Sequence, residues 1–339
     1  MNLRFYPYTI KLKDEFTISV GSRTTTPAIM VEIEQDGITG YGEASLPPYL
    51  KENQQSVINF LKKLNISKFQ FTAGLDSILD YVDNLSANDR AAKAAVDIAL
   101  HDLVGKIKNI PLHKYLNIPM SENVFTSYTI GISDEKSLKK KISSASGYKF
   151  LKIKLGTEND KKIIEQINSI TDQKLFVDVN QGWNDVHFAL DMISWLAEKN
   201  VVLVEQPLPK AMRKEAEWLK NNSPLPLIAD EAIQTLNDIE LMKNSYSGIN
   251  IKLMKCGGIR QAMRIIIKAR ELNLKIMIGC MTETSCAITA ASHLACLADW
   301  VDLDGAELIY NDIFTGCKIE NGKLIIPEFA GIGVEKISN

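Results

Sequence analysis

The stretch KFLKIKL, residues 149–155, alternates lysines with large apolar residues. A period of two is typical of a β-strand whose two faces meet different surroundings. Its aliphatic side chains share one face, and Lys152 and Lys154 share the other. At the edge of an open sheet these lysines would face solvent, whereas in a closed barrel they would face the interior, so the fold decides their chemistry.

Similar apolar segments recur along the chain, with helical stretches between them. They are FTSYTI (125–130), FLKIKL (150–155), LFVDVN (175–180), VVLVEQP (201–207), LPLIADE (225–231), GINIKLM (248–254), KIMIGCM (275–281) and WVDLDG (300–305). Corresponding positions in successive segments lie 22 to 27 residues apart, which suits a strand, a helix and two short loops. Eight such units predict an α/β fold with a (β/α)8-type barrel, and an open doubly wound sheet is the alternative.

The chain before residue 123 has a different character. The short strands FTISV, AIMVEIE and ITGYGEA precede a helical pattern, and Gln35-Asp36-Gly37 joins the last two strands as a hairpin. We therefore expect an α+β capping domain at residues 1–122 and a barrel catalytic domain at residues 123–312. A C-terminal segment, residues 313–339, is expected to return to the capping domain and complete it.

Composition and charge narrow the classes of partner. The formal net charge is −2 and the sequence pI is about 6.2, so the chain lacks the basic field that nucleic-acid binding requires. Its start shows no signal-peptide pattern, and no apolar run approaches the roughly 18 to 20 residues of a membrane span. We expect a cytoplasmic protein with reduced cysteines, without nucleic-acid or membrane partners, and with homo-oligomerisation left open.

Carboxylates fall on the interior face of three consecutive predicted strands. Asp178, Glu205 and Asp230 stand near the C-terminal ends of their strands, so they would converge on one side of the barrel mouth. Burying three unpaired carboxylates would cost several kcal/mol each, so a counter-charge is required. A carboxylate set without His or Cys favours a hard divalent cation, with Mg²⁺ as the first choice and Mn²⁺ as the second.

Lysines are expected to flank this metal site. Lys152 and Lys154 lie on the second predicted strand and Lys252 on the sixth, which is diametrically opposite in a closed eight-stranded barrel. Two such lysines on one strand are about 7 Å apart and repel by roughly 2.4 kcal/mol at an effective dielectric of about 20. Burial acts in the same direction, so we expect one of the pair to have a lowered pKa and to serve as a general base.

Five motifs at these positions resemble the enolase superfamily, in its muconate-lactonising subgroup. They are KIK (152–154), DVNQGW (178–183), VEQP (204–207), ADE (229–231) and NIKLMKCGGI (250–259). The resemblance covers essentially the whole chain and implies Lys/Lys base chemistry with Mg²⁺ stabilising an enediolate, a mechanism carried over from the superfamily. It implies these roles: Lys154 and Lys252 as catalytic bases, Lys152 tuning Lys154 and contacting the substrate carboxylate, and Asp178, Glu205 and Asp230 as metal ligands.

Lys255 and a histidine are the two alternatives for the base. Lys255 competes with Lys252, but strand parity would turn a residue three positions later to the other side, which favours Lys252. The mandelate racemase branch keeps a His base, and none of the four histidines stands at a predicted strand end. That branch is therefore disfavoured.

The strand WVDLDG discriminates among the reactions of the Lys/Lys subgroup. Asp302 and Asp304 would both point into the mouth, away from the metal carboxylates. This D-x-D pattern resembles that of dipeptide epimerases, which use it to hold the α-ammonium of the substrate. We therefore expect Mg²⁺-dependent epimerisation of a dipeptide at its C-terminal residue by two-base 1,1-proton transfer. The alternatives are o-succinylbenzoate synthesis, muconate-type cycloisomerisation, or a non-catalytic metal- or peptide-binding barrel.

Arg23 gives the expectation for the substrate side chain. The segment VGSRTTTP, residues 20–27, is expected to be a loop of the capping domain that closes over the mouth, and Arg23 is its charged group. It resembles the Arg-bearing loop of the L-Ala-D/L-Glu epimerases, and a guanidinium group suits the carboxylate of a glutamate side chain. An L-Ala-D/L-Glu dipeptide, plausibly released from murein, is therefore the expected substrate, with hydrophobic or other dipeptides as the alternative.

Overall fold

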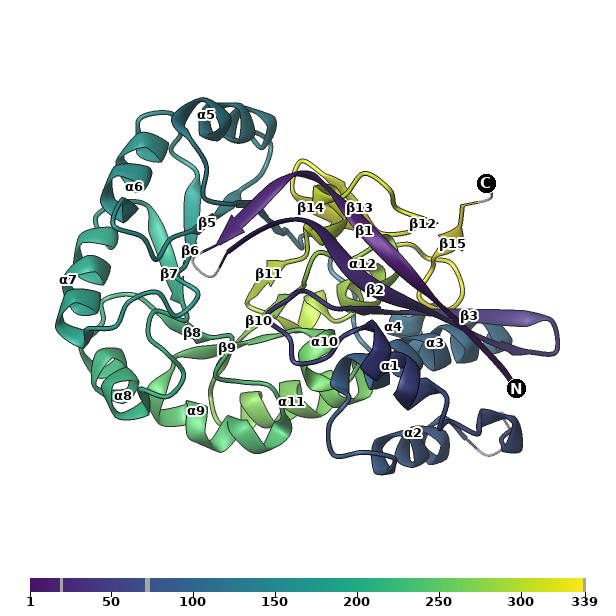
Figure 1. The fold of residues 1–339 in the computed structure, drawn as a ribbon. Helices are drawn as coiled ribbons and strands as arrows, with labels where there is room; N and C mark the ends of the chain where they lie inside the picture. Colours follow the sequence, from purple (N-terminus) through teal and green to yellow (C-terminus); the bar gives the residue numbers. More distant parts are fainter. Residues whose placement is uncertain (19–20, 71–73, 338–339) are drawn as a thin grey trace.

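A computed structural model describes residues 1–18, 21–70 and 74–337, and it contains two main sheets (Figure 1). The first is antiparallel, with strands β1 (Asn2–Ile18), β2 (Gly21–Gln35) and β3 (Ile38–Ser45) in that order. Helices α1 (Gln54–Leu61), α2 (Leu75–Asn84), α3 (Arg90–Lys108) and α4 (Leu112–Tyr115) follow. The predicted hairpin is confirmed: Gln35 pairs with Ile38, and the intervening Asp36 and Gly37 have φ of 53° and 81°.

The expected loop at residues 20–27 is wrong in the part that the structure describes. Residue 20 lies outside the described residues, but residues 21–27 form the first half of β2, where Arg23 pairs with Phe16 of β1. Three successive threonines explain the difference, because β-branched residues favour an extended backbone on a pleated surface. The paired ribbon of β1 and β2 extends over the barrel (Figure 1), and Arg23 lies near its tip, where it shares a cavity with barrel residues.

The second sheet is the predicted barrel of eight parallel strands. Its order follows the chain, with strands β4 (Ser127–Ile130), β5 (Phe150–Lys154), β6 (Lys174–Asp178), β7 (Val201–Glu205), β8 (Leu227–Ala229), β9 (Gly248–Ile251), β10 (Lys275–Gly279) and β11 (Trp300–Asp302). The helices between them are α5 (Glu135–Ser144), α6 (Asp160–Asn168), α7 (Val186–Leu196), α8 (Arg213–Asn222), α9 (Ile239–Ser245), α10 (Leu253–Cys256), α11 (Ile259–Glu271) and α12 (Ser285–Ser292). Several of them form the outer wall in Figure 1.

Side chains join the two ends of this sheet, strands β11 and β4. Ser127 donates a hydrogen bond from Oγ to Asp302 Oδ1 at 2.7 Å, and Leu303 donates from its backbone N–H to Thr126 Oγ1 at 2.7 Å. These contacts form a seam, defined here as residues 126–129 facing residues 302–304. The seam closes the sheet into a barrel.

Alternate residues of the strands build two layers inside the barrel. The lower layer is apolar and fully buried, and consists of Phe176, Leu203, Ile228 and Met277. Two positions further along β6 and β7 stand Asp178 and Glu205, both 0% exposed. The period-two rule therefore holds: an apolar floor lies beneath an ionic upper layer at the C-terminal ends of the strands.

The C-terminal residues contact the N-terminal helices. The backbone N–H of Leu112 donates to the Gly331 carbonyl at 2.7 Å, and the N–H of Ile332 donates to Asp102 Oδ1 at 2.9 Å. This part of the chain carries four short strands, β12 (Phe314–Thr315), β13 (Lys318–Glu320), β14 (Lys323–Ile325) and β15 (Glu335–Lys336). A two-residue turn at Asn321 and Gly322, both with positive φ, allows β13 and β14 to form a hairpin.

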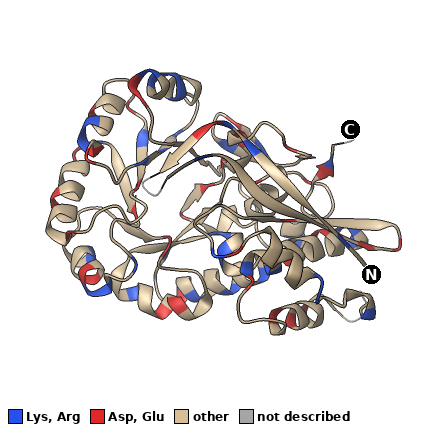
Figure 2. Ribbon diagram, viewed as in Figure 1, with Lys and Arg blue, Asp and Glu red and all other residues tan. Residues whose placement is uncertain are grey.

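The surface carries charges of both signs. Figure 2 shows blue and red residues interspersed along the outer helices, which agrees with the net charge of −2. Among the described residues, no helix combines the length and apolar composition that a bilayer-spanning segment requires. The five cysteines are all free thiols.

Glycines in β3 allow α3 to lie directly on the sheet. A Cβ atom added at Gly42 would overlap the carbonyl oxygen of Ala95 in α3. We expect Gly42→Ala to lower the free energy of unfolding by about 1–3 kcal/mol, because the buried helix must move away. Urea denaturation followed by circular dichroism measures this change.

Gly37→Ala is the matched comparison for that experiment. Gly37 lies in the β2–β3 turn with φ of 81°, and a Cβ atom there would meet no heavy atom within 4 Å. Gly37→Ala should lower the free energy of unfolding by only about 1 kcal/mol, the cost of a left-handed backbone at alanine. Equal losses for the two variants would show that close packing of α3 on β3 does not matter for stability.

Candidate functional site

A cavity of about 160 Å³ opens where the C-terminal ends of the barrel strands meet the tip of the β1–β2 ribbon. It is lined by residues of both sheets, including these predicted site residues: Arg23, Lys152, Lys154, Asp230, Lys252, Asp302 and Asp304. The remaining two, Asp178 and Glu205, are fully buried beside them. All nine residues proposed from the sequence are therefore brought together at one site.

The three carboxylates converge as the strand order predicts. Asp178, Glu205 and Asp230 each offer an oxygen, and the three oxygens lie within 4.8 Å of one another. Burial and the neighbouring Asp178 raise the pKa of Glu205 to about 7, whereas Lys154 and Lys152 outweigh burial and lower the pKa of Asp178. Three buried oxygen ligands at this spacing fit a hard divalent cation. We refer to them below as the carboxylate triad.

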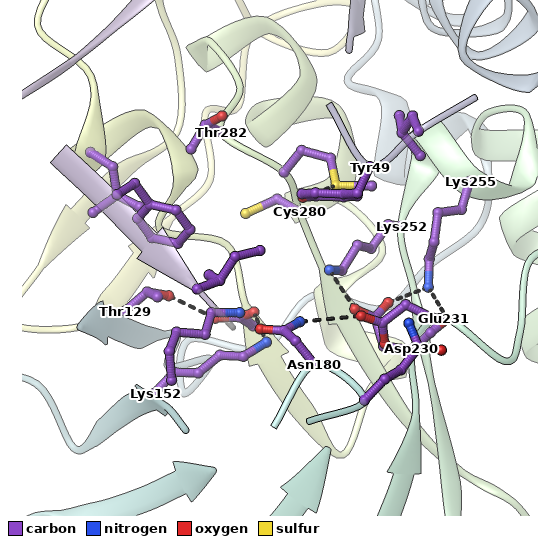
Figure 3. A pocket seen from close by; sticks show the side chains of 18 of the residues that line it. Tyr49, Thr129, Lys152, Asn180, Asp230, Glu231, Lys252, Lys255, Cys280 and Thr282 are labelled. Atoms are coloured by element: carbon purple, nitrogen blue, oxygen red, sulfur yellow. Dashed lines mark hydrogen bonds and ion pairs between the residues drawn. The ribbon is translucent and has the colours of Figure 1, made fainter. Parts of the chain in front are cut away.

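Two lysines approach the triad from opposite sides, and each has one carboxylate partner. Lys154 Nζ lies 2.6 Å from Asp178 Oδ2. Lys252 Nζ donates to Asp230 Oδ2 at 2.9 Å (Figure 3). They come from β5 and from the residue after β9, four strands apart in an eight-stranded barrel. Each ammonium group uses one of its three N–H donors on this carboxylate and thus keeps hydrogen-bonding capacity for a substrate between the two lysines.

Lys152 differs because it is surrounded by acids. Its Nζ lies 2.7 Å from Asp302 Oδ2, 2.7 Å from Glu205 Oε2 and 3.2 Å from Asp178 Oδ2. Burial alone would lower the pKa of Lys152, but these carboxylates outweigh it and raise that pKa well above its usual value. The sequence predicted a lowered pKa for one lysine of the pair Lys152 and Lys154, and Lys152 is not that lysine.

Lys255 also reaches the triad, contrary to the parity argument. Strand β9 ends at Ile251, and residues 253–256 form the helical turn α10, so a side chain three positions after Lys252 returns to the same side. Lys255 Nζ donates to Asp230 Oδ1, to the Asp230 carbonyl at 2.7 Å and to the Asn250 carbonyl at 3.0 Å. All three donors of this ammonium group are used, which leaves Lys252 as the lysine available to a substrate.

The acid pair at the end of β11, Asp302 and Asp304, lines the opposite wall. Asp302 accepts from Ser127 and pairs with Lys152, which outweighs burial and lowers the pKa of Asp302. Asp304 accepts from Thr129 Oγ1 at 3.2 Å, and burial together with Asp302 raises the pKa of Asp304 to about 7. The pair therefore presents at least one negative charge to the cavity.

Arg23 is held in place by the ribbon and by the barrel. Its guanidinium carbon lies 5.0 Å from the ring centroid of Phe16 and 5.6 Å from that of Tyr49. It also donates to Thr26 Oγ1 at 3.3 Å and to Thr282 Oγ1 at 3.5 Å. A half-buried guanidinium group, fixed between two rings, is thus prepared to meet an anion in the cavity.

Two family models match the chain. The model described as "Mandelate racemase / muconate lactonizing enzyme, N-terminal domain" matches residues 3–116, and that described as "Enolase C-terminal domain-like" matches residues 137–336. The chain belongs to the enolase superfamily. The resemblance drawn from the five motifs is therefore confirmed. The predicted fold is confirmed as well, because the chain forms a capping sheet and an eight-stranded barrel.

Several similar proteins within the family are dipeptide epimerases. An L-Ala-D/L-Glu epimerase from Bacteroides thetaiotaomicron is 50% identical over 99% of this chain and 88% of that protein. A hydrophobic dipeptide epimerase from Enterococcus faecalis is 34% identical, covering 96% of each. The substrate-liganded L-Ala-D/L-Glu epimerase from Bacillus subtilis superposes with a TM-score of 0.92 at 26% identity, covering 100% of this chain and 99% of that one.

Glu231 and Tyr49 are among the residues of the cavity wall that were not predicted. Glu231 follows Asp230 in the ADE motif and accepts from Asn180 Nδ2 at 3.3 Å, and burial next to Asp230 raises the pKa of Glu231 to about 8. Its adjacency to a predicted ligand was the available signal. Tyr49 donates from its hydroxyl to Met281 Sδ at 3.1 Å, across the two domains, and no periodicity in the sequence encodes that docking.

The different anchoring of Lys252 and Lys255 has a consequence for stability. In metal-free protein we expect Lys255→Met to lower the free energy of unfolding by about 1–3 kcal/mol more than Lys252→Met. The first substitution leaves two buried carbonyl groups without this donor, while the second leaves Asp230 still paired with Lys255. Urea titrations in chelator measure both variants; a larger loss for Lys252→Met would contradict the assignment.

Proposed function

We propose that this chain is a Mg²⁺-dependent dipeptide epimerase that inverts the C-terminal residue of L-Ala-D/L-Glu dipeptides. One observation carries the proposal: Lys154 and Lys252 reach the carboxylate triad from opposite sides of one cavity, each through a single carboxylate. Two bases facing each other across a bound substrate are what inversion at one carbon requires. The relative from Bacteroides thetaiotaomicron, named for this activity, supports it.

The substrate carboxylate would bind beside the triad. Lys152 is a charged donor in the cavity wall, and it can exchange one of its acidic partners for a carboxylate of the substrate. Mg²⁺ held by Asp178, Glu205 and Asp230, with Mn²⁺ as the second choice, would supply the Lewis acidity that stabilises negative charge on that carboxylate. A structure of an Enterococcus faecalis dipeptide epimerase complexed with Mg and L-Leu-L-Tyr supports this choice of metal.

The reaction then uses both lysines, one to remove the α-proton and the other to supply a different proton. The neutral lysine on the side of the α-proton takes it and becomes an ammonium, leaving the substrate as an enediolate. The ammonium on the opposite side donates a proton to the other face of the same carbon and becomes neutral. The configuration is inverted and the total number of protons is unchanged, so Lys154 and Lys252 exchange roles in the reverse direction.

The acid pair would hold the other end of the dipeptide. Asp302, the last residue of β11, and Asp304, two residues after it, line the cavity away from Asp230, and a carboxylate pair suits the α-ammonium of the first residue. The substrates of o-succinylbenzoate synthesis and of muconate-type cycloisomerisation carry carboxylates and no ammonium, so these acids would repel them. This feature favours a dipeptide over those two substrates, and over a metal-binding barrel without chemistry.

Arg23 would read the side chain of the inverted residue. Its guanidinium group lines the cavity between Phe16 and Tyr49, which suits a bidentate pair with a glutamate carboxylate. The same wall favours a second candidate, because Phe16, Ile18 and Leu50 are apolar and would also receive a hydrophobic side chain. Epimerisation of hydrophobic dipeptides is therefore the alternative function.

The proposal includes a division of labour along the chain. Residues 1–122 would supply substrate selection, residues 123–312 the metal and the bases, and residues 313–339 the connection back to the capping domain. The proposal leaves homo-oligomerisation open. It places the enzyme in the breakdown of dipeptides released from murein.

Isotope exchange tests the reaction. In D₂O with Mg²⁺, wild-type protein should epimerise L-Ala-L-Glu and L-Ala-D-Glu with deuterium entering at the glutamate α-carbon, and excess chelator should stop both. Lys252→Ala should abolish epimerisation yet retain exchange in one isomer, because Lys154 can still remove and return a proton on its own face. Lys154→Ala should retain exchange in the other isomer only. Proton NMR of both isomers measures all four outcomes.

The same spectra contain the results that would overturn the scheme. Full activity in chelator would exclude the metal, and epimerisation by either alanine variant would exclude a two-base mechanism. Absence of exchange across a library of dipeptides would leave a binding module. Lys255→Ala is informative as well, since it should not produce a one-isomer exchange pattern if Lys255 only anchors Asp230.

Substrate choice is tested at Arg23. A charge-assisted hydrogen-bonded pair is worth about 1.5–3 kcal/mol, so Arg23→Ala should lower kcat/KM for L-Ala-L-Glu by about one to two orders of magnitude. Turnover of L-Ala-L-Leu and L-Ala-L-Met should change little, because neither side chain pairs with a guanidinium group. Steady-state polarimetry on the three dipeptides gives the ratios.

Arg4→Ala serves as the control, because Arg4 is an exposed arginine on β1 of the same sheet. It should leave all three kcat/KM values unchanged. A wild-type preference for hydrophobic dipeptides, or an Arg23→Ala variant with undiminished L-Ala-L-Glu turnover, would favour the alternative function.

A further inference from the structure

Gln206 has an unusual backbone at a position next to the triad. It follows Glu205 directly, is 0% exposed, and has φ of 38°. Residues other than glycine seldom adopt the left-handed region, and they remain there only where the surrounding structure fixes them. The structure therefore holds Gln206 in a costly conformation, and its contacts show what that conformation achieves.

The side-chain amide of Gln206 uses its full hydrogen-bonding capacity. Its Oε1 accepts from the backbone N–H groups of Asp230 and Ala232, both at 3.0 Å. Its Nε2 donates to the Leu208 carbonyl at 2.9 Å and to the Tyr246 hydroxyl at 2.8 Å. Two donated and two accepted bonds are the most that a glutamine amide makes, so this side chain has a single allowed orientation.

The backbone of Gln206 extends the same connection to the neighbouring strands. Its N–H donates to the Ile228 carbonyl of β8 at 2.9 Å, and its carbonyl accepts from the N–H of Gln181, after β6, at 2.9 Å. Gln206 thus links the segments at the ends of β6, β7 and β8. These three strands, or the residue directly after them, carry Asp178, Glu205 and Asp230.

We infer that Gln206 is a positioning residue for the divalent cation site. It fixes the main chain of Asp230 relative to Glu205, so that the two carboxylates keep the spacing that a cation requires. Mg²⁺ demands a near-ideal arrangement of oxygen ligands, and loss of hydrogen bonds that orient its ligands commonly reduces metal affinity about 10- to 100-fold. Gln206 acts through the backbone of Asp230 and is not itself a ligand.

Calorimetric titration of chelator-treated protein with MgCl₂ tests this role without any dipeptide. Gln206→Met should weaken Mg²⁺ binding by about tenfold or more, because the methionine cannot hold the N–H groups of Asp230 and Ala232. Excess Mg²⁺ should restore part of the lost epimerase activity, as expected when only the occupancy of the site has fallen.

Gln173→Met is the matched control. Gln173 precedes β6 at the other end of the barrel, and its Nε2 also donates to two backbone groups, the carbonyls of Ala145 and Tyr148. This variant should lose a comparable set of hydrogen bonds, and thus thermal stability, while keeping the wild-type Kd for Mg²⁺. If both variants weaken binding equally, or if Gln206→Met weakens it less than about threefold, the inference is overturned.

Tyr246→Phe keeps the test decisive if Gln206→Met does not fold. It removes one partner of the Gln206 amide at a distance from the triad, and should weaken Mg²⁺ binding by about threefold or more; an unchanged Kd overturns the inference. The inference rests on the cation of the proposed function. Wild-type protein without saturable Mg²⁺ binding would overturn the metal site itself, whereas wild-type binding with unaffected variants would overturn only the role of Gln206.

Discussion

Repulsion among the three carboxylates is the constraint on which the rest of the site depends. Oxygens of Asp178, Glu205 and Asp230 lie within 4.8 Å of one another in a buried setting. At an effective dielectric of about 20, each pair of full charges at such a distance repels by roughly 3–4 kcal/mol. The barrel offsets this with four ammonium groups, from Lys152 and Lys154 on one side and Lys252 and Lys255 on the other. The bases of the proposed reaction are thus also counter-ions of the site.

The barrel and most of the site follow from a single sequence pattern. Residues of one strand alternate between two faces, so aliphatic residues such as Val177 on the helix side place Asp178 inside, and the regular spacing of eight segments closes the sheet. Charged residues that occupy the interior face at strand ends are costly to bury, so the sequence predicts that Lys154 and Asp178 share one site, and in the structure they lie 2.6 Å apart.

Other features depend on interactions that no periodicity encodes. Lys255 returns to Asp230 because the chain changes from strand to helical turn at residue 253, and the Lys152 pKa rises because acids from β6, β7 and β11 meet there. Arg23 and Tyr49 reach the cavity only through docking of the capping sheet on the barrel. Sequence therefore predicts positions along one strand well, and predicts poorly what depends on two elements meeting.

The seam between β4 and β11 joins barrel closure to ligand recognition. Asp302 accepts from Ser127 across this seam, and Leu303 donates to Thr126, while Asp302 is also proposed to hold the ammonium of the dipeptide. A mutation that altered recognition at Asp302 would at the same time loosen the junction of the first and last strands. During evolution, a substitution at Asp302 would therefore need stabilising substitutions elsewhere in the chain to compensate for it. Substitutions on the β1–β2 ribbon around Arg23 leave the seam intact. New specificities should therefore arise more readily on the ribbon than on β11.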